Sequence, residues 1–249
     1  AKVPTLIHES NGYAGLANKL LASNVSKICV SYPNMKRFFP ENKLVLTGNP
    51  IRKDLVNLDS IKEAAYKHFD LDQTKKTLFI MGGSGGAKML NTAMINGFER
   101  ILKAGYQIIW QTGAVYLKEV KEKTNYFHGK GLYINDFIYE MPYVYACTDV
   151  SITRAGSLTI SELALTQKAS ILVPSPNVTD NHQTKNAMAL VIKNAALLVK
   201  DVEVSEKLIN VALDLLSNQE KQVELKQNII TLASPNAAQK ITDEIMDLV

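Results

Sequence analysis

The chain has 249 residues, of which 46% are hydrophobic and 21% charged, a composition typical of a globular protein. This length suits one large or two small domains, and no apolar run approaches the roughly 20 residues of a membrane-spanning helix. The net charge is +4, yet the first 53 residues carry eight Lys or Arg and only two Glu. That imbalance fits an anionic partner, such as phosphate or a membrane surface, and equally a solvated basic face.

Strands and helices alternate along almost the whole chain. Before a break at Gly48-Asn49-Pro50, the pattern predicts strands over 5–7, 27–30 and 44–46 and helices over 14–22 and 34–39. After a helix near 60–69, it predicts six strands, over 77–81, 107–111, 132–134, 150–153, 169–173 and 196–199. The other helices are predicted over 87–103, 117–123, 138–146, 158–165, 182–193, 205–217, 219–233 and 237–248.

This repetition of strand, short polar turn and helix predicts an α/β fold with a doubly wound parallel sheet. Residues 54–235 supply six strands and form a complete Rossmann-like domain. The first 50 residues supply only about three strands, too few for a second sheet with its own core. We therefore expect this part to be the end of a larger domain, with residues before Ala1 missing from the sequence.

A glycine-rich stretch follows the apolar strand at 78–81. Gly82-Gly83-Ser84-Gly85-Gly86-Ala87 leads directly into a helix. Strand, glycine-rich turn and helix together point free backbone N–H groups at an anion, and Ser84 adds a hydroxyl donor. The stretch matches neither a Walker A loop nor a dinucleotide fingerprint. Phosphate binding and a merely tight turn both remain open.

Polar residues also follow other predicted strands, where a parallel sheet meets its ligands. Near the start, Ser10 or Asn11 is a ligand group or a helix cap. Arg52 projects into a cleft and pairs with a diphosphate, or belongs to an ordinary linking turn. Ser157 caps the helix that follows, and Glu162 accepts both ribose hydroxyls or interacts with the helix dipole. Near 174–187, Asp180 or Asn181 caps another helix, and His182 and Gln183 suit a sugar.

Metal-binding patterns are missing from the sequence. There is no H-E-x-x-H, no Cys/His cluster and no Asp-x-Asp pair. Cys29 and Cys147 lie far apart and read as buried thiols of a reducing compartment. The residues therefore suggest that a phosphorylated sugar is handled without metal or other cofactor.

These loops, in this order, resemble the MurG family of peptidoglycan N-acetylglucosaminyltransferases. The resemblance covers the whole chain, and its motifs are specific only when taken together. They are Ile7-His8-Glu9-Ser10-Asn11, Thr47-Gly48-Asn49-Pro50-Ile51-Arg52, Gly82–Ala87, Asn135-Asp136-Phe137-Ile138, Arg154–Glu162, and Asp180-Asn181-His182-Gln183 with Asn186-Ala187. Ser10 and Gly85 depart from the pattern, because the family usually has Gln at both positions.

The resemblance implies a GT-B fold of two Rossmann-like domains. Residues 1–50 would be the last part of the N-terminal domain, 51–235 the UDP-sugar domain, and 236–249 a helix that returns to the N-terminal domain. The donor UDP-N-acetylglucosamine would bind in the cleft without metal. Residues of six loops would contact it: Ser84 and Arg52 at the diphosphate, Phe137 and Ile138 at the uracil, Ser157, Leu158, Thr159, Ile160, Ser161 and Glu162 along the nucleotide, and His182, Gln183 and Asn11 at the sugar.

The implied reaction is an inverting transfer of N-acetylglucosamine to the C4 hydroxyl of undecaprenyl-diphosphate-muramyl pentapeptide, which gives lipid II. The implied place is the cytoplasmic face of the bacterial membrane, bound peripherally, with no nucleic-acid partner. About the first hundred residues of the family have no counterpart here, so we expect this chain to be inactive alone.

The catalytic base is unassigned, and His8 is the only nearby histidine. Two alternatives stay open: a non-catalytic or partner-completed UDP-sugar-binding subunit, and another GT-B member such as a UDP-sugar epimerase.

Overall fold

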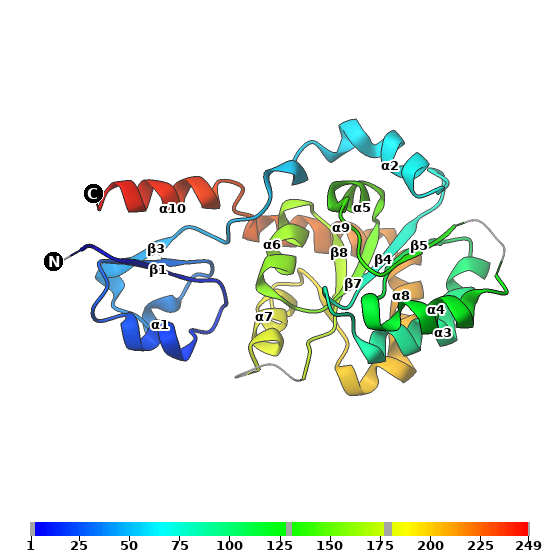
Figure 1. Ribbon diagram of the computed structural model, residues 1–249, viewed down its shortest axis with the longest axis horizontal. Helices are drawn as coiled ribbons and strands as arrows, with labels where there is room; N and C mark the ends of the chain where they lie inside the picture. Colours follow the sequence, from blue (N-terminus) through cyan, green and yellow to red (C-terminus); the bar gives the residue numbers. More distant parts are fainter. Residues whose placement is uncertain (1–2, 128–130, 177–180, 249) are drawn as a thin grey trace.

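The structure, a computed structural model, describes residues 3–127, 131–176 and 181–248. Two units of unequal size lie side by side, and each is built on a parallel sheet (Figure 1). The smaller unit contains β1 (Leu6–Glu9), β2 (Lys27–Val30) and β3 (Leu44–Leu46), which pair in that order, and the helix α1 (Leu16–Leu21). Its small core includes Ile28, Met35 and Phe39.

The last helix of the chain lies against this smaller unit. Helix α10 (Ala237–Met246) returns to the side of the smaller unit (Figure 1), and Glu244 forms a 2.9 Å ion pair with Lys27 of β2. The chain therefore leaves the smaller unit after β3 and returns to it at the end, so the two units are joined by two crossings.

The larger unit contains a six-stranded parallel sheet. Its strands lie in the order β6 (Leu132–Asn135), β5 (Gln107–Gln111), β4 (Thr77–Met81), β7 (Val150–Thr153), β8 (Ala169–Leu172) and β9 (Leu197–Leu198). The order reverses between β4 and β7, and ligands of open α/β sheets bind outside the carboxyl ends of the strands at such a reversal.

Helices cover both faces of this sheet, which explains why β4 is a continuous apolar run. They are α2 (Lys62–His68), α3 (Lys88–Lys103), α4 (Ala114–Thr124), α5 (Met141–Cys147), α6 (Ser157–Leu165), α7 (His182–Val191), α8 (Val204–Ser217) and α9 (Gln219–Ile229).

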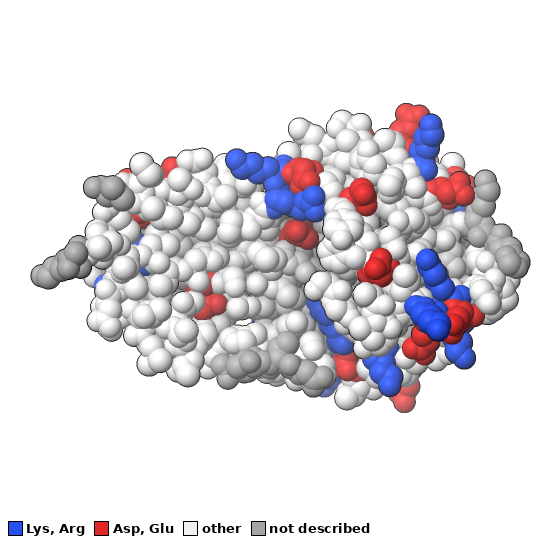
Figure 2. Space-filling view, in the orientation of Figure 1, with Lys and Arg blue, Asp and Glu red and all other residues white. Residues whose placement is uncertain are grey.

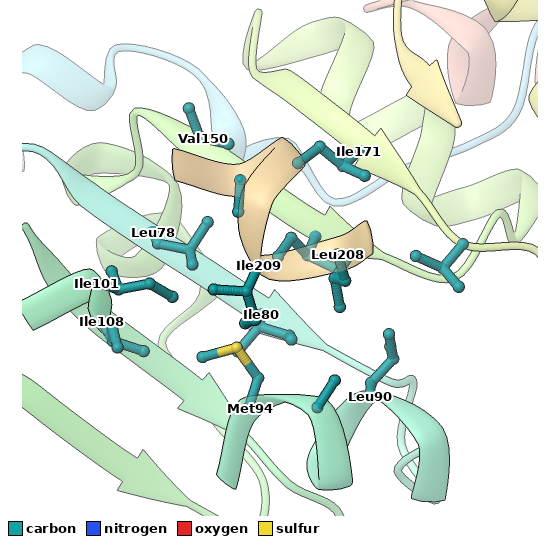
Figure 3. Close-up of a cluster of buried hydrophobic side chains, with 14 of the residues drawn as sticks. Leu78, Ile80, Leu90, Met94, Ile101, Ile108, Val150, Ile171, Leu208 and Ile209 are labelled. Atoms are coloured by element: carbon teal, nitrogen blue, oxygen red, sulfur yellow. The ribbon is translucent and has the colours of Figure 1, made fainter. Parts of the chain in front are cut away.

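The core on one face forms where α3 and α8 meet the sheet. Ile80, Met94 and Ile209 point into it from β4, α3 and α8 (Figure 3). Gly97 lets the two helices pack closely, because it has no Cβ atom. A Cβ atom at this position would collide with Ile209. On the other face Phe79, Tyr145 and other apolar side chains form a second core. This burial fixes the strands whose ends carry the site.

The predicted α/β class and the strands are confirmed, with strand ends within two residues. Five helix predictions are wrong in detail. Helix α4 begins at Ala114, three residues before the predicted start, and α9 ends at Ile229, where the 3-10 turn Ile230–Leu232 follows. The segment 34–39 contains only a short 3-10 turn, Met35–Arg37, which begins after Asn34 in the left-handed region at φ 64°. Residues 60–69 begin as a 3-10 turn, and the helix starts at Lys62. Helix α5 begins at Met141, not at Ile138, and Pro142 lies in its first turn, because proline has no N–H to donate to the Ile138 carbonyl.

Candidate functional site

Of the helices that begin at the carboxyl edge of the larger sheet, three face one cavity: α3 after β4, α6 after β7 and α7 after β8. Ala87 and Gly156 precede α3 and α6 and provide no side chain that caps these helices, and Asn181 precedes α7. The first backbone N–H groups of a helix have no partner within it, and they carry a partial positive charge. Three such ends at one edge create a favourable place for a phosphorylated ligand.

A cavity of about 430 Å³ lies where the loops before these helices meet. Glycines form one wall, and polar side chains that include Thr159 and Gln183 form another. The lining residues are Gly82, Gly83, Gly86, Ala87, Lys88, Met89, Tyr116, Arg154, Gly156, Thr159, Ser175, Pro176, Gln183 and Asp201. A larger cavity of about 610 Å³ lies at the opposite, amino end of the strands, near Tyr106. The smaller cavity is the candidate site, because the helix ends point there.

Two glycines of the β4–α3 turn, Gly82 and Gly86, lie where no side chain would fit. A Cβ atom at Gly82 would collide with Ala87, and one at Gly86, whose φ is +77°, would collide with the carbonyl of Thr112. A Cβ atom at Gly85 would meet nothing. Ser84 is exposed at the tip and is not part of the cavity wall. The turn itself is therefore tight, and its backbone provides the inner surface.

Glu162 lies on α6 and accepts a 2.9 Å hydrogen bond from the hydroxyl of Tyr145, which is fully buried. Burial raises the pKa of Glu162 above its usual 4.5, although Tyr145 and Arg52 oppose this. It is the sixth residue of the helix, beyond the first turn in which the dipole acts strongly. Glu162 is not among the residues that line the cavity, and its role toward a ribose stays a prediction.

Arg52 is not free in this state. Its guanidinium makes two 2.6 Å bonds to the carboxylate of Asp54 and a 3.5 Å bond to the carbonyl of Tyr139. These contacts raise its pKa, chiefly through the hydrogen bonds to Asp54. The pair is partly exposed to solvent, so a diphosphate that reached Arg52 would compete with Asp54 for the same face of the guanidinium.

The segment 157–161 is divided between the cavity and the interface of the two units. Gly156, not Ser157, precedes the first turn of α6, so the predicted cap at Ser157 is wrong. Thr159 lines the cavity, Leu158 is exposed and Ile160 is buried in the core. Ser161 donates to the carbonyl of Ser157 at 3.0 Å and accepts a bond from Asn49 of the other unit.

Gln183 ties two loops together at the cavity. Its Oε1 accepts backbone bonds from Ala155 at 3.2 Å and from Ser175 at 2.9 Å. This leaves the Nε2 donor for a ligand hydroxyl. The ring of His182 lies 6.0 Å from that of Tyr13 in the smaller unit. Asn181 precedes α7 but its Oδ1 accepts from Thr184, and Asp180 lies outside the described residues.

Residues 137 and 138 lie beside β5. The N–H of Ile138 donates to Oε1 of Gln111 at 2.9 Å, and the side chain is buried. Phe137 is partly exposed and packs edge-to-face on Tyr139, with ring centroids 4.8 Å apart. The Ile138 N–H therefore already donates a hydrogen bond, and a uracil that accepted from this N–H would have to displace Gln111.

His8 lies inside the smaller unit. Its Nε2 is 3.0 Å from the carbonyl of Gly48 and 3.2 Å from Oγ of Ser31. A carbonyl can only accept, so Nε2 carries the proton and cannot act there as a base. Neighbouring Glu9 is held by backbone N–H groups of Gly15 and Asn11 and by the amide of Asn18. Both residues support the loop that carries Asn11.

Three residues of the site have contacts that the sequence does not predict: Arg154, which lies in one of the motifs but has no role assigned to it there, Tyr145 and Gln111. Arg154 binds Asp201 and the carbonyls of Val173 and Pro174, which joins the loops after β7 and β8 at the cavity. Tyr145 and Gln111 act through contacts with residues distant in the chain. Figure 2 shows that the charged side chains on this face lie mostly over the larger unit and near its boundary with the smaller unit.

Residues 77–241 match the Glycosyltransferase family 28 C-terminal domain. Two curated relatives carry the name UDP-N-acetylglucosamine--N-acetylmuramyl-(pentapeptide) pyrophosphoryl-undecaprenol N-acetylglucosamine transferase. The one from Cytophaga hutchinsonii is 45% identical over 99% of this chain and 66% of its own length. The one from Bacteroides fragilis is 47% identical over 99% of this chain and 65% of its own length.

The crystal structure of Acinetobacter baumannii MurG matches with a TM-score of 0.72 and 28% identity, over 98% of this chain and 67% of that one. The epimerase structure from Neisseria meningitidis, at TM-score 0.71 but 14% identity over 99% and 70%, shows the fold alone. These matches confirm the GT-B fold class. On the family match and the identity to its curated relatives, the chain belongs to the MurG family within glycosyltransferase family 28.

Proposed function

We propose that this chain binds UDP-N-acetylglucosamine and, within a protein of its relatives' length, transfers the sugar to the C4 hydroxyl of a lipid-linked muramyl pentapeptide. The chain spans about two thirds of the length of the curated relatives it matches, so the acceptor half of the proposal rests on those relatives. The observation that carries the donor half is the convergence of three helix starts on one cavity, two of which, those of α3 and α6, have no capping side chain. That arrangement suits a diphosphate.

The proposed roles follow the loops. The diphosphate lies against the turn 82–87 and reaches Ser84 and Arg52. The ribose hydroxyls donate to Glu162, and the uracil lies by Phe137 and Ile138. Residues 157–161 flank the nucleotide, while His182, Gln183 and Asn11 hold the sugar.

As the glycosidic bond breaks, negative charge grows on the leaving diphosphate. The N-terminus of α3 and Arg52 stabilise that charge, which is what accelerates such a transfer. The attacking C4 hydroxyl gives its proton to a base that is not assigned here, since His8 already donates from Nε2 to a carbonyl.

The alternative of a UDP-sugar epimerase has less support. It rests on structural likeness at 14% identity, whereas the named transferases are 45–47% identical. A partner-completed donor-binding subunit makes the same prediction for donor binding and differs only in the acceptor.

The same proposal includes the division into 1–50, 51–235 and 236–249, and peripheral attachment to the cytoplasmic membrane surface. In the part of the chain that is described, no helix has both the length and the apolar character needed to cross a membrane.

Isothermal titration calorimetry with UDP-N-acetylglucosamine and with UDP tests the donor half. We expect both to bind in EDTA, because helix ends and Arg52 provide the positive charge. Addition of Mg²⁺ should leave the dissociation constants unchanged apart from its own complex with the nucleotide. Absence of binding in EDTA that Mg²⁺ restores would contradict the metal-free proposal. Absence of binding in both would contradict the donor itself.

A further inference from the structure

Asn186 is a buried polar residue that links the two units. It lies on α7 and is 1% exposed. Its Oδ1 accepts from the backbone N–H of Gly12 at 3.1 Å, and its Nδ2 donates to Oδ1 of Asn11 at 3.1 Å and to the carbonyl of Ala155 at 3.3 Å. One side chain therefore contacts the loop after β1 in the smaller unit and the loop after β7 in the larger one.

The orientation of this amide follows from its partners. The N–H of Gly12 can only donate and the carbonyl of Ala155 can only accept, so Oδ1 of Asn186 faces the first and Nδ2 faces the second. Because Nδ2 of Asn186 donates to Asn11 as well, Asn11 must present its oxygen to Asn186. Two backbone groups thus determine the direction of the Asn11 amide as well.

The other end of Asn11 agrees with this direction. Its Nδ2 donates to Oε1 of Glu9 and to Oγ of Ser10, both at 3.3 Å. Hydrogen bonds to an ionised carboxylate usually are shorter than this. The Asn11 Nδ2 is therefore the weakly held donor of the chain of amides, and it is the atom that a hydroxyl group of a ligand could recruit.

We propose that Asn186 is a positioning residue, which fixes the Asn11 amide so that its nitrogen, and not its oxygen, is presented to the donor sugar. This inference rests on the proposed function, in which Asn11 reaches the sugar of UDP-N-acetylglucosamine. Asn186 also donates to the carbonyl of Ala155, next to Gly156 in the loop proposed to bind the nucleotide. The Asn11 amide is therefore oriented for the sugar only when the two units are in contact.

A second buried asparagine provides a matched control. Asn49 also joins the units, with bonds from Nδ2 to the carbonyl of Ser10 and to Oγ of Ser161, both at 3.1 Å. It is 2% exposed and accepts a bond from Ser31, but it does not contact the Asn11 side chain. A variant at this position weakens the interface without turning Asn11.

The test compares UDP with UDP-N-acetylglucosamine by calorimetry, because only the second has the sugar. The variants are Asn186→Asp, Asn11→Ala, the double variant and Asn49→Ala. In Asn186→Asp an oxygen replaces Nδ2, so the Asn11 amide should flip and turn its donor away from the sugar. We expect Asn186→Asp and Asn11→Ala each to weaken UDP-N-acetylglucosamine binding relative to UDP roughly three- to tenfold, the loss of one net hydrogen bond.

The double variant should be no weaker than Asn11→Ala alone, because the residues act as a unit. Asn49→Ala should lower the melting temperature and leave the ratio of the two affinities unchanged. Additive losses in the double variant, or equal weakening of both ligands by Asn186→Asp, would overturn the inference. If Asn186→Asp does not fold, Asn186→Ala is judged by the same ratio. Failure of the unaltered chain to bind UDP-N-acetylglucosamine would instead contradict the proposed function.

Discussion

Replacement of Glu162 by Gln separates the ribose contact from the rest of the nucleotide site. The change keeps the shape of the side chain, and Oε1 of the glutamine still accepts the bond that Tyr145 now donates at 2.9 Å. What is lost is the negative charge and one acceptor. Hydrogen bonds to charged groups contribute about 1.5–3 kcal/mol, so we expect the dissociation constant of UDP to rise about 10- to 150-fold.

Calorimetry with UDP and with inorganic diphosphate measures this effect, because diphosphate has no ribose. Binding of diphosphate should not weaken, because the change removes a negative charge and no donor to the anion. The exposed Glu220 in the first turn of α9 supplies a control, Glu220→Gln, for any general effect of charge. Equal losses for UDP and diphosphate would refute the reasoning and assign Glu162 to the helix.

Stability provides an independent check on the same variant. Burial raises the pKa of Glu162, so its charged form is disfavoured in the folded protein. A raised carboxyl pKa means that the folded state binds more protons, and stability falls as pH rises from the usual 4.5 to the raised value. Glu162→Gln removes this penalty. We therefore expect a melting temperature at pH 7 that is equal to or higher than that of the parent.

Three further predictions follow from named contacts. Gly86→Ala should destabilise the chain by about 1–3 kcal/mol in urea unfolding and weaken UDP binding, because φ is +77° and a Cβ atom would collide with the Thr112 carbonyl. The control Gly85→Ala should change stability by less than about 0.5 kcal/mol, since a Cβ atom there would meet nothing. Equal losses of stability in the two variants would contradict this account. Burial raises the pKa of Glu9, but hydrogen bonds from Gly15, Asn18 and Asn11 outweigh it and lower the pKa below 4.5, so stability from this carboxylate is present above pH 4.5 and lost as pH falls through the lowered value. Glu9→Gln should reduce the dependence of the free energy of unfolding on pH below 4.5. An unchanged dependence on pH would contradict this role of Glu9. Arg52→Ala should weaken UDP binding, whereas Asp54→Ala should leave it unchanged or strengthen it, since Asp54 competes with the ligand for the guanidinium. Weaker UDP binding by Asp54→Ala would contradict this competition.

The sequence predicted most of the fold because its strands are locally unmistakable. Leu78-Phe79-Ile80 is apolar throughout, and such a run is stable only when both faces of the strand are covered. The glycine-rich turn was predicted for the same local reason. The start of α5 was predicted wrongly although Pro142 in its first turn is a local signal. The bond from the N–H of Ile138 to the side chain of Gln111, 27 residues earlier, is a different case. Local pattern contains no trace of that contact.

The candidate site shows the same division. The loops themselves follow from strand ends and turn residues, which are local. The atoms that a side chain presents depend on partners far away in the chain: Arg52 turns to Asp54, Glu162 to Tyr145, and Asn11 to a residue 175 positions later. The predicted roles of these residues stay predictions, since a rotamer chosen by a distant partner cannot be read from spacing.

The two crossings between the units have a mechanical consequence. Gly48, in the first crossing, has φ +86°, and a Cβ atom there would collide with Ser234 in the second. The two crossings therefore lie against each other, with Gly48 of the first beside Ser234 and Ala237 of the second. A change in the position of one unit relative to the other has to bend both crossings at this place. We expect the smaller unit to pivot about Gly48 and Ser234, because these are the residues where the two connections meet.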